Sequence, residues 1–280
     1  MQVGNCPFCL RNGVELQDSH YFSQAVYKGF RAEELQNPNP LVLKAGRMWQ
    51  SSEQVHDFAF CWDCEQIFNR AGENWLVPRL GWQNKGFPFW NLVKLASFTS
   101  DPKDQDLRTY SCSTVPTINC DSTAHFGLGI FWKGHAHQWP DCERLSLGAY
   151  YGENLRQYLR GEASFPKDMA LILRIVPHDE PLWSGRMPML IDKHPFHWFN
   201  FYLRGLDFTL AVGKNIPDYL RHCCFVMNPT RPILAGIHIL CDEWATMKKA
   251  MAKSTRSRSA AAFLSTPRTH TIKPPTEPDW

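Results

Sequence analysis

Two Cys-x-x-Cys pairs constrain the fold of this chain more than any other feature. Cys6 and Cys9 form the first pair, Cys61 and Cys64 form the second, and 51 residues separate them. A Cys-x-x-Cys turn places two sulfur atoms on one side of a knuckle, and Zn²⁺ prefers four tetrahedral ligands. The pairs therefore predict one closed four-cysteine zinc site. Four free thiols and two redox-active pairs are the alternatives, but no βαβ pattern accompanies either pair.

The segment between the pairs is longer than in a simple zinc ribbon, which indicates a functional insertion. Residues 13–20 predict a short strand that ends at His20, and residues 22–30 carry apolar side chains at helical spacing. Residues 36–56 are typical of a loop. Residues 58–76 predict a strand, the second Cys-x-x-Cys turn and then a helix.

This order of elements resembles the treble-clef HNH (His-Me finger) endonucleases, in particular their zinc-containing branch. The segments QDSHYFSQAVYKGFR and FCWDCEQIFNRAGE are similar to uncharacterised bacterial HNH-like proteins that carry SHxxP-like and CxxCE motifs. IFWKGHAHQW and LGAYYGENLRQYLRGE resemble the second half of those proteins, so the resemblance covers about residues 1–240. It implies a metal-dependent endonuclease that cleaves DNA or RNA, with a role in phage defence or as a toxin-like effector.

The resemblance also implies roles for single residues. His20 would be the general base, and Glu65, directly after the second cysteine pair, would hold a catalytic Mg²⁺ or Mn²⁺ ion. The four cysteines would hold a structural Zn²⁺ ion. These residue types suit the chemistry, because phosphodiester hydrolysis needs a base that titrates near neutral pH and a cation that neutralises phosphate charge.

One position departs from the family pattern. The family has a metal-binding Asp or His before the catalytic His, whereas this chain has Ser19, whose neutral hydroxyl is a poor Mg²⁺ ligand. Asp18 would face the other side of the strand. Glu73 could then share the ion with Glu65, or His20 could itself bind a softer metal. The alternative function is a catalytically inactive zinc-finger module that binds nucleic acid or a partner protein.

The remainder of the chain predicts an α+β fold. Residues 145–159 follow the pattern of an amphipathic helix closed by Gly161, and residues 243–254 predict another helix. Residues 203–208 fit a hairpin turn. Strand-rich segments separated by Pro, Gly or Asp predict an antiparallel sheet; they span residues 169–176, 188–191, 196–203, 208–212 and 222–227.

We therefore expect three parts. A zinc-stabilised treble-clef ββα module would occupy residues 1–82, a mixed domain with antiparallel strands would occupy 83–245, and a basic, disordered tail would occupy 246–280. From Lys248 onward, seven basic and two acidic residues give a net charge of +5, against +3 for the whole chain. Such a tail could contact phosphates non-specifically, or could serve only to keep the chain soluble.

The region 83–142 leaves further alternatives open. A second metal site could be formed by His125, His135, His137 and Cys142, with Cys112 and Cys120, but their spacing is irregular and the segment GHAHQW is more typical of a polar turn. The same region is rich in aromatic residues and would be an interface with a partner protein or a second copy if the protein were a structural subunit.

Two absences in the sequence bear on where the protein works. The chain opens without a signal-peptide pattern and contains no apolar run of about 20 residues, so we expect a cytoplasmic protein that does not enter a membrane. No Walker A motif, dinucleotide-binding glycine fingerprint or nucleophile elbow is present.

Overall fold

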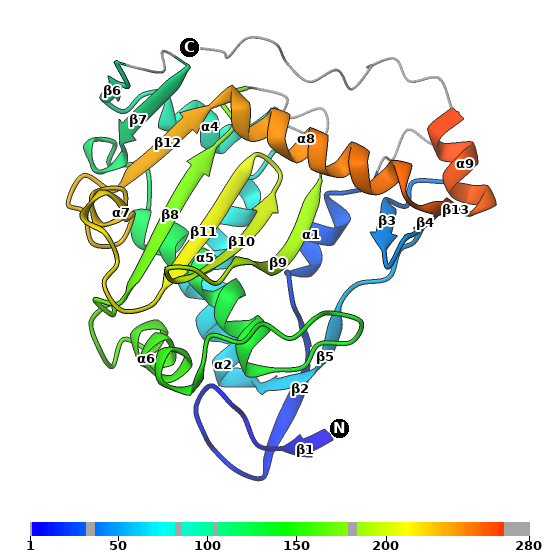
Figure 1. Cartoon of the computed structure of the whole chain (residues 1–280). Coiled ribbons are helices and arrows are strands. Elements are labelled where there is room, and N and C mark those ends of the chain that lie inside the picture. Colours follow the sequence, from blue (N-terminus) through cyan, green and yellow to red (C-terminus); the bar gives the residue numbers. More distant parts are fainter. Residues whose placement is uncertain (1, 32–36, 82–85, 103–105, 179–183, 266–280) are drawn as a thin grey trace.

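The structure, a computed structural model, describes residues 2–31, 37–81, 86–102, 106–178 and 184–265. It is a mixed α+β fold with three sheets (Figure 1). The largest sheet has seven strands in the order β6-β7-β12-β8-β11-β10-β9. In this order they span Phe98–Ser100, Leu107–Ser111, Pro232–Gly236, Met169–Ile175, Leu206–Val212, His197–Leu203 and Gly185–Asp192.

Neighbouring strands in this sheet are antiparallel except for the parallel pair β12–β8. The predicted turn at 203–208 is confirmed, because Arg204 and Gly205 join β10 to β11 with positive φ angles of 50° and 94°. Two such residues match the twist of a tight hairpin. Four of the five predicted strand segments coincide with β8, β9, β10 and β11.

The fifth predicted strand, at 222–227, is wrong. Helix α7 (Asp218–His222) ends there, and the chain continues in turns. Cys224 is buried and packs in a small cluster with Ala170 and Leu220. The apolar side chains of this segment therefore fill space beside the sheet without extending it.

A long helix at the centre of the molecule was not predicted. Helix α5 (Cys120–Ala136) lies against one face of the seven-stranded sheet (Figure 1). Its side chains are apolar almost all round, so they show no amphipathic stripe. Gly127 allows Phe208 of β11 to approach, since an added Cβ would lie 2.5 Å from that ring.

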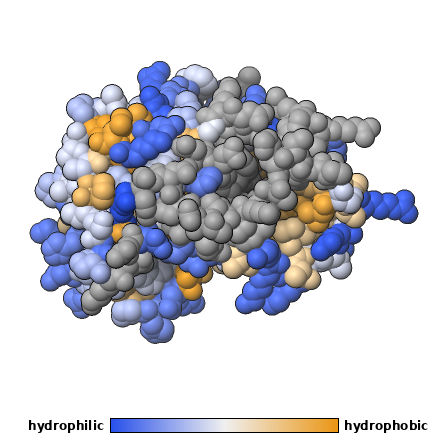
Figure 2. Space-filling model, turned by 90° about the horizontal axis from the view of Figure 1, so that it is seen from above, coloured by the Kyte–Doolittle hydropathy of each residue, from blue (hydrophilic) through white to orange (hydrophobic). Residues whose placement is uncertain are grey.

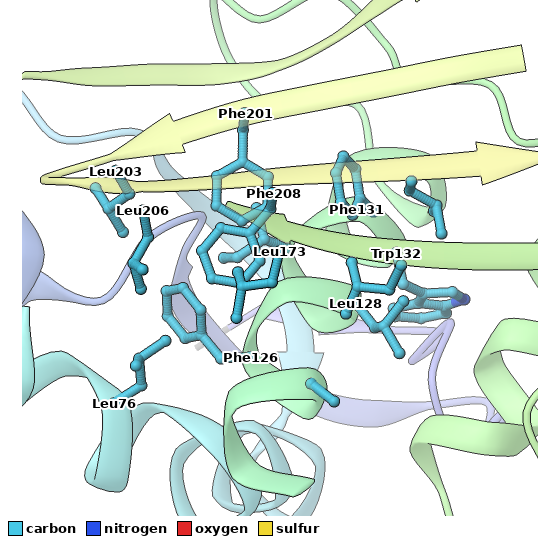
Figure 3. Packing of buried hydrophobic residues seen from close by; sticks show 14 of the residues in the cluster. Leu76, Phe126, Leu128, Phe131, Trp132, Leu173, Phe201, Leu203, Leu206 and Phe208 are labelled. Carbon is cyan, nitrogen blue, oxygen red and sulfur yellow. The ribbon is translucent and has the colours of Figure 1, made fainter. Parts of the chain in front are cut away.

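Packing around α5 makes one continuous core. Figure 3 shows Phe131 of α5 beside Phe201, which itself stacks on Phe208 with 4.6 Å between ring centroids. On its other side α5 meets the N-terminal elements, where Trp132 contacts Phe8 at 5.0 Å between ring centroids. The same buried cluster thus contains side chains from the predicted module and from the sheet.

The N-terminal sheet has the order β1-β2-β5 and is antiparallel, with strands Gln2–Gly4, Val14–His20 and His56–Cys61. Helix α2 (Trp62–Phe68) follows β5 directly and continues into a π-helical turn at Asn69–Glu73. The strand predicted to end at His20 and the strand, turn and helix predicted for 58–76 are confirmed. Short helices complete this part of the chain: α1 (Gln24–Lys28), α3 (Asn74–Leu76) and α4 (Pro88–Val93).

Residues 36–56 contain a hairpin where the sequence predicts a loop. Strands β3 (Leu41–Lys44) and β4 (Arg47–Gln50) turn at Ala45 and Gly46, which have positive φ angles of 45° and 71°. A third strand, β13 (Thr255–Arg256), pairs in parallel with β4. The hairpin therefore belongs to a sheet completed by the far end of the chain.

The structure also differs from the disordered tail expected from residue 246. Helix α8 runs over Ile237–Ala252, and α9 covers Arg258–Ser265 beyond β13. Buried Ala260 and the pairing with β4 give this segment packing partners that its local composition does not reveal. Residues 266–280 lie outside the described residues. Helix α6 (Ala149–Leu159) confirms the amphipathic helix predicted at 145–159, with Gly161 behind it at a φ angle of 72°.

Candidate functional site

The four cysteines of the two pairs lie together. Their sulfur atoms all lie within 4.8 Å of one another; the four residues are Cys6, Cys9, Cys61 and Cys64. The first pair is held by a tight turn in which the Cys6 amide donates to the Arg11 carbonyl at 3.0 Å and the Leu10 amide donates to the Cys6 carbonyl at 2.9 Å. The second pair lies at the junction of β5 and α2. A cluster of this kind could hold a metal ion such as zinc.

The surroundings of the cluster suit a bound cation with thiolate ligands. Arg11 donates to the sulfur of Cys9 at 3.3 Å and to that of Cys61 at 3.2 Å, and its guanidinium also pairs with Asp63 at 2.6 Å. A hydrogen bond from Cys64 lowers the pKa of Cys6 to about 4, while the same bond raises the pKa of Cys64. The guanidinium of Arg11 would compensate part of the negative charge that four thiolate ligands bring to a bound metal ion.

The antiparallel strands β2 and β5 present two histidines side by side. His20 ends β2 and pairs in register with His56 at the start of β5. Their rings stack with 5.4 Å between centroids, and the Oδ1 atom of Asp18 lies 2.6 Å from Nδ1 of His56. The sequence prediction did not include His56, although its place just before the predicted strand at 58 could have indicated a cross-strand partner for His20.

Ser19 is not available as a metal ligand. A bulge at Ala59 shifts the register between β2 and β5, and beside it the side chain of Ser19 is buried in the core. There its hydroxyl accepts from the Phe60 amide at 3.3 Å and donates to the Gln17 carbonyl at 3.3 Å. Both hydrogen bonds serve the bulge itself.

Behind strands β2 and β5 lies a buried lysine that the sequence prediction also missed. Lys133 of α5 is 2% exposed, and its Nζ atom lies 3.1 Å from Oε1 of Glu73 and 3.4 Å from the carbonyl oxygen of His20. Burial works against the charged form, but Glu73 and Glu65 outweigh it and raise the pKa of Lys133. A single lysine inside an apolar helix is the only trace of this contact in the sequence.

Glu65 and Glu73 have different surroundings. Glu73 is committed to Lys133, so the expectation that it shares an ion with Glu65 has no support in the geometry. The Oε1 atom of Glu65 is buried and has no hydrogen-bond partner in the part of the chain that the structure describes. Within the described part of the chain, the cysteine cluster is the only group of three or more His, Cys, Asp or Glu side chains close enough to share a metal ion.

The environment of His20 affects its titration. Partial burial lowers its pKa below the usual 6.5, His56 and Lys133 act in the same direction, and Asp18 and Glu65 oppose them. At neutral pH the imidazole is therefore uncharged, which is the form that can accept a proton.

The three histidines of the region 83–142 each contact a different group of the protein. His125 contacts the Leu159 carbonyl at 3.1 Å, and His135 accepts from the Leu147 amide at 3.3 Å. His137 pairs with Asp57 of β5 at 2.9 Å. Each ring thus has its own structural partner.

Comparisons with known proteins give no relative: no family model, curated protein or solved structure matches this chain. None of the helices in the described ranges is both long and apolar enough to cross a membrane.

Proposed function

We propose that this protein is a metal-dependent endonuclease of the treble-clef, HNH-like kind, which hydrolyses phosphodiester bonds in DNA or RNA. The observation that carries the proposal is the position of His20 at the end of β2. The neighbouring antiparallel strand, β5, leads directly into α2, and the cysteine cluster lies at that junction. This order of strand, strand and helix around a zinc-binding cluster is what the family resemblance implies.

In the proposed reaction His20 takes a proton from the attacking water. Its lowered pKa keeps the ring neutral near pH 7, and His56, held by Asp18, limits the orientations that the ring can adopt. General-base catalysis of this kind contributes about 10²- to 10⁴-fold to the rate. Lys133 fixes the backbone of the base through its contact with the His20 carbonyl.

Glu65 would hold the Mg²⁺ or Mn²⁺ ion. Its buried oxygen has no hydrogen-bond partner among the described residues, and Mg²⁺ is commonly bound by one or two carboxylates together with waters and substrate phosphates. When bound, the ion supplies positive charge to the scissile phosphate and to the leaving oxygen. The four cysteines would hold Zn²⁺ and fix strands β2 and β5 relative to α2.

The test is cleavage of supercoiled plasmid and of a labelled RNA in Mg²⁺ or Mn²⁺. Wild type is compared with His20→Ala and with Glu65→Gln, after equal zinc content has been confirmed for all three proteins. We expect cutting by wild type in the presence of either metal, and at least 10²-fold slower cutting by His20→Ala. Equal cutting by wild type and His20→Ala would exclude His20 as the base.

One observation favours the second candidate, a catalytically inactive module that binds nucleic acid or a partner protein. Ser19, at the family's metal-ligand position, uses its hydroxyl inside the bulge. The absence of cutting by zinc-loaded wild type on either substrate would favour this candidate.

A further inference from the structure

The elements that form the third sheet carry a concentration of positive charge. Residues 244–265 contain five basic residues and no acidic residue, and the hairpin of β3 and β4 adds two more basic residues. Six of these seven residues are exposed, and we call five of them the basic cluster: Arg47, Lys249, Lys253, Arg256 and Arg258. Lys248 is also exposed but has an interaction partner of its own, so it is not counted in the cluster.

Within the described part of the chain, none of the five side chains of the basic cluster forms an ion pair, whereas Lys44 on the same hairpin pairs with Asp141 at 2.8 Å. Like charges held close together repel one another, so the cluster favours a partner with closely spaced negative charges. Figure 2 shows hydrophilic side chains projecting at the right-hand edge of the molecule, the side on which Figure 1 places α9 and β13.

The cluster is held in place by the backbone. The Thr255 amide donates to the Gly46 carbonyl at 2.9 Å, and the Ser257 amide donates to the Met48 carbonyl at 2.9 Å. Lys249 lies in the last turn of α8, and Lys253, four residues on, is the residue directly after the helix and still has helical backbone angles, so both lie on one side of it. A basic segment that only kept the chain soluble would need no such fixed attachment.

The cluster is also connected to the candidate site. The β3–β4 hairpin belongs to the segment that joins His20 to His56, and His56 is the ninth residue after Arg47 along the chain. An extended chain covers at most about 3.3–3.6 Å per residue, so the Cα atoms of Arg47 and His56 lie within roughly 32 Å of each other. A nucleic-acid strand of modest length can contact both.

We propose that the basic cluster binds the sugar-phosphate backbone of a nucleic-acid strand whose neighbouring stretch reaches His20. The second half of this statement rests on the proposed nuclease function, and the first half does not. Three of the five side chains are arginines, whose planar guanidinium groups match phosphate oxygens in pairs. The charges come from a hairpin, an edge strand and two helices, unlike the single amphipathic helix that typically lies on a membrane surface.

The test measures binding with the full chain in a His20→Ala background, so that the probe is not cut. The probes are fluorescein-labelled 30-nucleotide single strands of RNA and DNA, and fluorescence anisotropy is recorded from 50 to 300 mM KCl. The test variant combines Arg47→Gln, Lys253→Gln, Arg256→Gln and Arg258→Gln. The control variant loses the same charge through Arg144→Gln, Lys167→Gln, Lys193→Gln and Lys214→Gln, all exposed positions outside the cluster.

We expect the test variant to bind at least about 10-fold more weakly at 100 mM KCl. Its slope of log affinity against log salt should fall by about 3, because each lost phosphate contact on a single strand removes about 0.7. The control variant should stay within about twofold of its parent. Circular dichroism and zinc content must be equal for all the proteins.

Two outcomes would overturn the proposal. One is equal loss of affinity in the test and control variants. The other is that the parent protein ignores both strands but binds vesicles with 30% anionic lipid through the cluster, which would assign it to a membrane surface.

Cleavage by the two charge variants with His20 restored separates the two proposals. Cluster-dependent binding without any cleavage would refute the nuclease function alone. His20-dependent cleavage with an unchanged KM in the test variant would refute the role of the basic cluster alone.

Discussion

The seven-stranded sheet and the N-terminal sheet are stabilised in different ways. The seven-stranded sheet buries nearly every side chain of β8, β10 and β11, and α5 covers it with a full layer of aromatic and aliphatic groups. The sheet of β1, β2 and β5 has three short strands and leaves Val3, Phe58 and the neighbouring Trp62 exposed. A sheet this small buries little apolar area, so the cysteine cluster at its edge would supply stability that packing does not.

Removing the metal should have the largest effect, and it should fall mainly on the small sheet. Zinc binding to four-cysteine sites contributes about 10 kcal/mol or more in small domains, so Cys61→Ser should destabilise β1, β2 and β5 by several kcal/mol. Hydrogen exchange resolved by mass spectrometry would check this. Protection should be lost first in residues 2–20 and 56–64, with Cys112→Ser, a buried cysteine outside the cluster, as the control. Uniform loss over both sheets would contradict the comparison.

Truncating the core of the large sheet should give the converse result. Phe208→Ala removes a fully buried ring that stacks on Phe201, and such changes cost about 3–5 kcal/mol. Urea denaturation would measure the loss, and zinc content should stay unchanged. If this variant also failed to retain zinc, the two sheets would not be stabilised independently.

The contact between the two regions can be tested through Lys133. Lys133→Met leaves the buried Glu73 carboxylate without its partner, which should cost about 3–5 kcal/mol. The double variant Lys133→Met/Glu73→Gln removes both charges and should recover much of that loss in thermal denaturation. A double variant as unstable as the single one would show that the ion pair is not the reason for the instability.

The smallest expected effects concern the titration of His20. Because its pKa in the folded protein lies below that in the unfolded chain, protonation favours unfolding. Its contribution to stability is therefore complete above pH 6.5 and is lost as the pH falls towards the lower folded value. His56→Ala should raise the pKa of His20, and Asp18→Asn should lower it, since the two neighbours act in opposite directions. NMR titration of the imidazole protons would check both, and shifts of the same sign would contradict the assignment.

The sequence predicts the small sheet better than it predicts the elements that pack on the large sheet. The cysteine spacing and the strand that ends at His20 are local signals, and both are confirmed. Strand-rich segments separated by Pro, Gly or Asp also located β8 to β11. Helix α5 escaped prediction because it is apolar on all sides and contains Gly127, Gly129 and Gly134, which lower helix propensity in isolation.

The candidate site was predictable only where its residues are close in sequence. His20 and Glu65 could be proposed from their positions beside the cysteine pairs. Lys133 reaches His20 across 113 residues, and no local pattern reports such a contact. The same holds for the hairpin at residues 41–50, whose third strand comes from the other end of the chain.

The pairing of β13 with β4 has a consequence for the order in which the protein is made. All four cysteines have been synthesised by residue 64, so the cysteine cluster can assemble before the large sheet has been made. The β3–β4 hairpin must wait for Thr255, which bonds to Gly46 across 209 residues. During translation the β3–β4 hairpin therefore stays without its third strand, and the basic cluster forms only after Arg258 has been synthesised.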